Sequence, residues 1–131
     1  MPDSDAWKKG SAMRTRLMGE DYAKRMAQTV YTDDHMKKFG DYATEAVFGL
    51  LWSRPGLDVK TRTLICVISD TAMGREAELA IHLRMALREG WTEEELIEAL
   101  LHLGGYVGLP LVREAMICAR QVFAEVRAEK A

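Results

Sequence analysis

The chain has 131 residues, a formal net charge of −2 and a hydrophobic share of 48%, which is typical of a globular protein. This length suits one domain with a sizeable core, and the interspersed charges argue against long disordered segments and against the basic face of a nucleic-acid-binding domain. The first ten residues, MPDSDAWKKG, lack the apolar stretch of a secretory signal, and Glu98 and His102 interrupt the most apolar stretch, residues 96–112. We therefore expect a soluble, cytoplasmic protein with no membrane or nucleic-acid partner.

Apolar residues recur at spacings of three and four along the chain, which predicts an all-α fold. Two short helices are expected over residues 5–17 and 20–30. A third helix is expected from a cap at Asp33 or Asp34 to about Trp52, where the segment SRPG interrupts the helical pattern.

The next two helices are predicted to form a tight hairpin. Asp58 can cap a helix over residues 59–73, and Gly74 can supply the positive φ that ends it. A helix over residues 75–89 follows after so short a turn that the two should lie side by side.

Two further helices are expected towards the end of the chain. Thr92 and Glu95 have the spacing of a capping box for a helix over residues 93–105. Four residues are then expected to loosen or break it: Gly104, Gly105, Gly108 and Pro110. The proline suits the first turn of a last helix that runs to about residue 127.

The helix over residues 75–89 carries an unusual polar arc. At about 100° per residue, four residues share this arc: Arg75, Glu78, His82 and Glu89. Two apolar arcs flank it, one of Leu79, Ala80, Leu83, Ala86 and Leu87 and one of Ile81 and Met85. We expect the polar arc to face a crevice or a subunit contact, and the opposite residues, Arg84 and Arg88, to face solvent.

Glu78 and His82 lie one turn apart within this arc, and two interpretations are open. They can be a pair on a wet surface that contributes a few tenths of a kcal/mol to the helix. Alternatively, a carboxylate beside an imidazole fixes its tautomer and stabilises its charged form, as a general acid or base requires. We expect no metal, because a catalytic zinc site needs about three protein ligands and neither His35 nor His102 has a recognisable ligand spacing.

Two cysteines, Cys66 and Cys118, lie far apart and form no CxxC motif. Each sits in an apolar helical pattern, where free cysteine usually behaves as a small core residue. We expect core positions for both.

Four short motifs follow one another along the chain. They are Trp52 with Arg54-Pro55-Gly56-Leu57, Thr61-Arg62, Arg75-Glu76-x-Glu78-Leu79 leading to His82-Leu83-Arg84, and Tyr106-x-Gly108-x-Pro110. Together they resemble the gamma-carboxymuconolactone decarboxylase family over about residues 48–126, whereas the N-terminal helices, about 5–45, match loosely. We expect a single domain over residues 1–131.

The resemblance implies an alkylhydroperoxidase D-like helical fold and a homo-oligomer, commonly a trimer or hexamer, with sites near subunit contacts. It implies cofactor-independent conversion of gamma-carboxymuconolactone to beta-ketoadipate enol-lactone in the breakdown of protocatechuate and other aromatic compounds. The expected partner is thus a small lactone or carboxylate substrate, and no cofactor is expected.

Six residues are candidates for this chemistry. His82 is the candidate proton donor, and Glu78 would orient it or handle the proton in turn. Arg75 and Arg62 are candidates to hold the retained carboxylate or the developing oxyanion, although each can equally be a structural ion-pair partner. Trp52 and Tyr106 can wall the pocket, or can simply fill the core beside helix breaks.

Three positions depart from the family pattern and keep other functions open. Ala46 stands where histidine is usual, His102 stands where glutamine is usual, and Asp70 places an acid in the apolar run LICVISDTAM. A related enzyme that tautomerises or opens a similar lactone acid is therefore an alternative. Hydroperoxide reduction is disfavoured, because Arg75 and Glu78 occupy the two positions of the CxxC motif that this chemistry needs. A non-enzymatic protein whose polar arc is only an oligomer contact is the last alternative.

Overall fold

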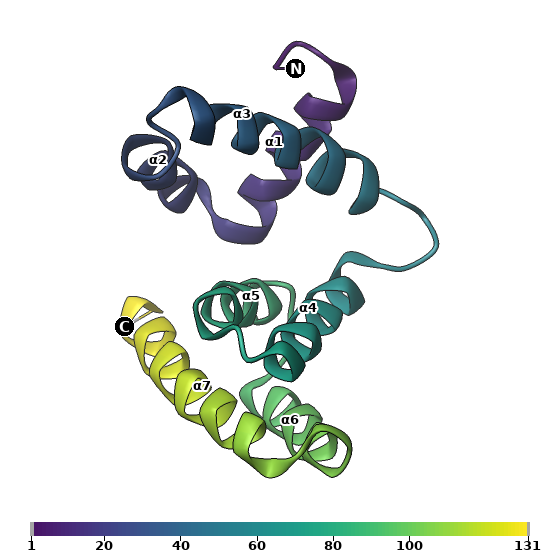
Figure 1. The fold of residues 1–131 in the computed structure, drawn as a ribbon, viewed down its shortest axis with the longest axis vertical. Coiled ribbons are helices and arrows are strands. Elements are labelled where there is room, and N and C mark those ends of the chain that lie inside the picture. Colours follow the sequence, from purple (N-terminus) through teal and green to yellow (C-terminus); the bar gives the residue numbers. More distant parts are fainter. Residues whose placement is uncertain (1, 131) are drawn as a thin grey trace. The chain divides into compact units, whose positions relative to one another are not determined.

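The computed structural model describes residues 2–130, and every regular element in that range is helical (Figure 1). The helices are α1 (Asp5–Met18), α2 (Glu20–Thr29), α3 (Asp34–Ala43), η1 (Thr44–Leu51), α4 (Val59–Met73), α5 (Glu76–Arg88), α6 (Glu93–Val107) and α7 (Leu109–Lys130). The all-α prediction is confirmed. None of these helices is long and apolar enough to cross a membrane.

The chain divides into two compact units, one up to Leu57 and one from Asp58 onwards. That the whole chain forms a single domain stays a prediction.

The predicted helix ends are largely confirmed, because polar side chains cap them. Asp33, rather than Asp34, accepts a hydrogen bond from the backbone N–H of Met36, and Asp58 accepts one from that of Thr61. The capping box at the start of α6 is present in both directions between Thr92 and Glu95. These bonds satisfy backbone donors that the first turn of a helix leaves without partners.

In the first unit, the third predicted helix is not α-helical throughout. It is α-helical only as far as Ala43, and the next eight residues form the π-helix η1. The backbones of η1 and α1 approach so closely that a Cβ on Gly10 would overlap the carbonyl oxygen of Thr44, and one on Gly49 would overlap that of Ala6. Hydrophobic periodicity does not distinguish these wider turns from an α-helix.

The second unit consists of α4 to α7 packed around one core (Figure 1). The fully buried apolar residues of this core include Val67, Leu79, Leu83, Ala86, Leu96, Leu100, Val112 and Ala119. Both apolar arcs predicted on α5 contribute buried residues, since Leu83 of the broad arc and Met85 of the narrow one are at most 1% exposed.

The expectation that Gly104 and Gly105 loosen or break α6 is wrong. The helix continues through both residues and ends only at Gly108, whose φ is +100°. Gly104 is buried, and a Cβ there would lie 3.0 Å from a side-chain carbon of Leu109. The residue therefore gives α7 room to pack closely against α6.

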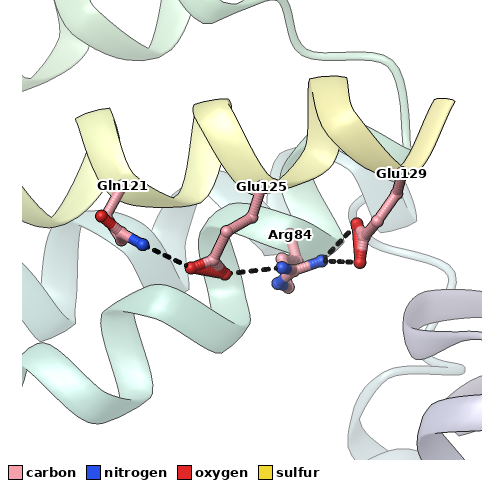
Figure 2. Close-up of polar contacts among 4 residues, drawn as sticks. All are labelled: Arg84, Gln121, Glu125 and Glu129. Carbon is pink, nitrogen blue, oxygen red and sulfur yellow. Dashed lines mark hydrogen bonds and ion pairs between the residues drawn. The ribbon is translucent and has the colours of Figure 1, made fainter. Parts of the chain in front are cut away.

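The expectation that Arg84 faces solvent is also wrong. Its guanidinium bonds both carboxylate oxygens of Glu129, at 2.9 and 3.1 Å, and one oxygen of Glu125, at 2.9 Å (Figure 2). Gln121 holds the other oxygen of Glu125 at 2.9 Å. The side chain of Arg84 is 33% exposed, so this network joins α5 to α7 at the edge of the unit.

Candidate active site

The site is built on the hairpin of α4 and α5, which lie side by side (Figure 1). Gly74 ends α4 in the left-handed conformation, with φ +69° and ψ +32°. Its N–H donates to the carbonyl of Thr71 at 3.2 Å, and the N–H of Arg75 donates to the carbonyl of Asp70 at 2.9 Å. This pair of bonds is the Schellman arrangement, so the turn that was predicted from Gly74 is fixed to the backbone of Asp70.

The side chain of Asp70 reaches across the hairpin to His82. Its Oδ2 lies 2.5 Å from Nδ1 of His82, which is shorter than a usual N–H···O hydrogen bond. The two side chains are only 11% and 18% exposed. A carboxylate can only accept a hydrogen bond, so Nδ1 carries the donated proton and Nε2 is the nitrogen left for other chemistry.

The acid that orients His82 is therefore Asp70, not Glu78. Within residues 2–130 no hydrogen bond or ion pair links Glu78 to His82, although Glu78 is half-buried one turn earlier on the same helix. Any part that Glu78 plays in proton transfer stays a prediction. The signal that could have identified Asp70 was present in the sequence, as an acid in an otherwise apolar helical run.

The other candidates in this unit lie on α4, at the start of α5 and on α6. Arg62 is half-buried in the first turns of α4, and Arg75 is exposed at the N-cap of α5. Tyr106 is 79% exposed on α6, and its ring contacts His102, with 5.3 Å between the ring centres. Tyr106 is thus not a core residue of this unit, and substrate-binding roles for all three residues stay predictions.

Trp52 belongs to the first unit and is 5% exposed there. Its ring stacks on Phe48, with ring centres 6.1 Å apart. Core packing accounts for this position, and the predicted role in a pocket wall stays untested.

The two cysteines are free thiols that are partly buried. Burial, followed by the negative charge of Asp70, raises the pKa of Cys66 to about 11. Burial, followed by the charges of Glu76 and Glu125, also raises the pKa of Cys118. Since the thiolate is the reactive form, neither cysteine has the low pKa that thiol-dependent peroxide reduction needs.

No group of three or more histidine, cysteine, aspartate or glutamate side chains that could hold a metal ion occurs within residues 2–130. The Asp70–His82 pair joins a carboxylate to an imidazole, the two groups of an acid–base pair. A shielded imidazole with one nitrogen fixed by a carboxylate can donate or accept a proton at the other nitrogen.

Comparison with known proteins identifies the family to which this chain belongs. The carboxymuconolactone decarboxylase family matches residues 37–121, about two thirds of the chain. The chain belongs to this family. The match includes the whole hairpin of α4 and α5, so the carboxymuconolactone decarboxylase family resemblance seen in the motifs is confirmed.

Three known proteins are similar in sequence to this chain. The 4-carboxymuconolactone decarboxylase of Acinetobacter baylyi is 36% identical over 96% of this chain and 92% of its own length. The nitrosuccinic acid decarboxylase npaB of Metarhizium robertsii is 33% identical over 89% of this chain and 80% of its own. An uncharacterized 15.0 kDa protein of Paracoccus denitrificans is 37% identical over 62% of each chain. Two of the three are named decarboxylases, and the prediction of a carboxy-lyase is confirmed at that level.

Proposed function

We propose that this protein decarboxylates a small lactone acid without a cofactor, with gamma-carboxymuconolactone as substrate and beta-ketoadipate enol-lactone as product. One observation carries the proposal: in a chain of the carboxymuconolactone decarboxylase family, the shielded imidazole of His82 is held at Nδ1 by Asp70. The 36% identity to a named 4-carboxymuconolactone decarboxylase supports this choice of substrate.

The substrate itself would supply the electron sink. When the carbon–carbon bond to the leaving carboxylate breaks, carbon dioxide departs, and the electron pair delocalises through the ring double bond onto the lactone carbonyl oxygen. The protein must then stabilise this oxyanion and deliver a proton to carbon. One proton is consumed for each carbon dioxide released, so the donor must be reprotonated from solvent after each turnover.

His82 is the proposed proton donor, acting through Nε2. The bond from Nδ1 to Asp70 supports this role because it fixes the ring orientation and keeps Nε2 available. Glu78, one turn before His82, would pass protons to or from the ring. Arg75 and Arg62 would hold the retained carboxylate or the oxyanion, because a guanidinium stays charged and offers paired donors.

The names of two relatives define a broader substrate class. A carboxymuconolactone and nitrosuccinic acid each retain one carboxylate after losing another, and each carries a group that accepts the electron pair, a conjugated lactone in one and a nitro group in the other. We therefore place both acids, together with related unsaturated lactone acids, in the first substrate panel.

The test is carbon dioxide release from this panel by the purified protein, with and without a chelator, in H2O and in D2O. We expect release from gamma-carboxymuconolactone that survives chelation, and one carbon-bound deuterium in the product formed in D2O. The matched variants are His82→Gln and His35→Gln, since His35 is exposed on α3 in the other unit. Release that is unchanged in His82→Gln would remove this histidine from the mechanism.

A second candidate function is proton transfer without loss of carbon dioxide, such as tautomerisation or opening of a related lactone acid. The Asp70–His82 pair favours it, because an oriented imidazole is sufficient for acid–base chemistry. Deuterium exchange into a substrate that loses no carbon dioxide would favour this candidate over decarboxylation.

A further inference from the structure

The first unit contains a cavity of about 320 Å³ that the proposed reaction does not use. Helices α1, α2 and α3 line it, together with Tyr31 and with Thr44, the first residue of η1. The volume falls within the usual range of small-molecule sites, about 300–1,000 Å³. Turns of π-helix such as those of η1 are also frequent at functional sites.

Arg14 of α1 brings a positive charge to this cavity and meets only neutral groups there. Its guanidinium donates hydrogen bonds to the hydroxyl of Thr44 at 3.2 Å and to that of Tyr31 at 3.4 Å. It also lies over the rings of Tyr31 and Phe48, with 5.3 Å from Cζ to each ring centre. Within residues 2–130 no carboxylate is ion-paired with it. Because the side chain is half-buried, a bound anion would supply the missing counter-charge.

The other charges of the lining also favour an anion. Lys37 adds a second cation, and its ammonium group has no hydrogen-bond or ion-pair partner among the described residues. The acid in the lining is Asp41, whose Oδ1 accepts a hydrogen bond from the indole N–H of Trp7 at 3.2 Å. Two cations and one acid give the lining a net positive charge, which attracts an anion and repels a cation.

Two hydroxyl groups of the lining still have a proton to donate. Tyr31 accepts a hydrogen bond from Arg14, so its own hydroxyl proton stays available. The hydroxyl of Ser11 has no hydrogen-bond partner in the part of the chain that the structure describes. That of Thr44, by contrast, already donates to the carbonyl of Gly40 at 2.7 Å. An arginine, a lysine and two hydroxyl donors are the groups that bind a carboxylate.

The remaining lining suits a ligand with a hydrocarbon body. Helix α2 contributes three uncharged side chains, those of Ala23, Met26 and Ala27. Gly40 of α3 is buried against the ring of Tyr31, and a Cβ there would lie 3.0 Å from a carbon of that ring. An inorganic anion would use only the charged and hydroxyl groups, whereas an organic acid would also cover the apolar wall.

The geometry points to a binding site for a small organic carboxylate in the first unit. Arg14 and Lys37 hold the carboxylate, the hydroxyls of Ser11 and Tyr31 are further donors, and the wall formed by α2 covers the hydrocarbon body. All these residues belong to the first unit, so the inference does not rest on the proposed decarboxylation.

The test is calorimetric titration of the full chain with pentanoate, acetate, inorganic phosphate and pentylammonium. We expect pentanoate to bind more tightly than acetate, because each methylene group that it buries lowers Kd by about fourfold. The amide NMR signals of Gly40 and Thr44 should shift with pentanoate and stay unchanged with pentylammonium. Phosphate that binds as tightly as pentanoate and shifts the same signals would overturn the assignment to an organic acid.

Two variants test the cations. Arg14→Gln removes the charge but keeps a hydrogen-bond donor for Thr44, so we expect the Kd of pentanoate to rise by about 10–100-fold, the contribution of hydrogen bonds to a charged group. Lys37→Glu changes an exposed side chain, so the protein should fold even if Arg14→Gln does not. It should raise the same Kd, because it puts a negative charge beside the carboxylate.

The matched control is Arg25→Gln. Arg25 is exposed on α2 outside the cavity and also lies over a tyrosine ring, with 5.6 Å from Cζ to the ring centre of Tyr22. We expect its Kd to equal that of the wild type. The inference is overturned if pentanoate does not bind, if it leaves the signals of Gly40 and Thr44 unchanged, or if neither cavity variant raises Kd above that of the control.

Discussion

Helix α5 carries two ion-paired side chains whose surroundings differ. His82 meets one acid of α4, and its side chain is 18% exposed. Arg84 meets two acids of α7, Glu125 and Glu129, whose side chains are 44% and 60% exposed (Figure 2). His82 and Arg84 are only two positions apart on α5, yet the pair of His82 is shielded and the pairs of Arg84 lie in contact with water.

We propose that this difference separates a pair that serves the chemistry from a pair that serves the structure. Exposed ion pairs contribute little because water and salt screen them, so the Arg84 network serves mainly to fasten α7 to α5. A shielded pair costs desolvation energy and is a poor way to stabilise a helix hairpin. The position of Asp70 and His82 is better explained by chemistry that uses a fixed imidazole.

Replacing the imidazole of His82 is expected to have the largest effect. If activity did not fall, the distinction between the shielded pair and the exposed network would be lost. His82→Gln removes the proposed proton donor, so we expect kcat to fall by about 10²–10⁴-fold, the usual contribution of general acid catalysis. Helix content by circular dichroism should stay unchanged. A loss of activity of the same size in His35→Gln would contradict a specific role for His82.

Replacing the acid should have a smaller effect. Asp70→Asn keeps the shape of the side chain but removes the charge that fixes the Nδ1 proton, so we expect a fall in kcat of about 10–100-fold, as for other groups that orient a histidine. KM should change little. Nitrogen NMR of His82 should show a mixture of tautomers in the variant, and a single unchanged tautomer would contradict the positioning role of Asp70.

The two cysteines can test the difference between the shielded Asp70–His82 pair and the exposed Arg84 network. The charge of Asp70 acts on Cys66, whereas that of Glu125 acts on Cys118. Since burial and Asp70 raise the pKa of Cys66 to about 11, its alkylation rate should keep rising as the pH increases towards 11. Rates are measured with iodoacetamide in the single-cysteine variants Cys118→Ser and Cys66→Ser. A rate for Cys66 that levels off near the usual thiol pKa of about 8.5 would show that this side is open to water.

The smallest effect is expected on the exposed side. Arg84→Met removes the network to α7 while retaining the aliphatic stem, so we expect a loss of at most about 1 kcal/mol in the free energy of unfolding, shrinking in high salt. Activity should not change. Denaturant titration and kcat measured on the same preparation test both parts, and a large fall in kcat would erase the distinction between the two sides.

Local chemistry made much of the fold predictable from the sequence. Caps such as Asp58 and Thr92 and the left-handed Gly74 act within a few residues, so their patterns are visible in a short segment. The π-helix η1 and the continuation of α6 through Gly104 depend on packing against other helices. The spacing of apolar residues along one helix does not reveal that packing.

The site was predicted less completely for the same reason. His82 was found, because an imidazole in a polar arc is visible on one helix. Its partner Asp70 and the partners of Arg84 lie on other helices, 12, 41 and 45 residues away in sequence. The periodicity of α5 alone therefore predicts Glu78 as the partner of His82 and solvent around Arg84.

The turn at Gly74 has a consequence for the order of folding. It makes the Asp70–His82 contact a local one, closed by a loop of twelve residues, and loops of about ten residues close in about 10–100 ns. The contacts between α5 and α7 span more than forty residues and require a larger loss of chain entropy before they form. The Asp70–His82 contact therefore requires a smaller loss of chain entropy than the contacts between α5 and α7, because the turn at Gly74 already holds α4 beside α5.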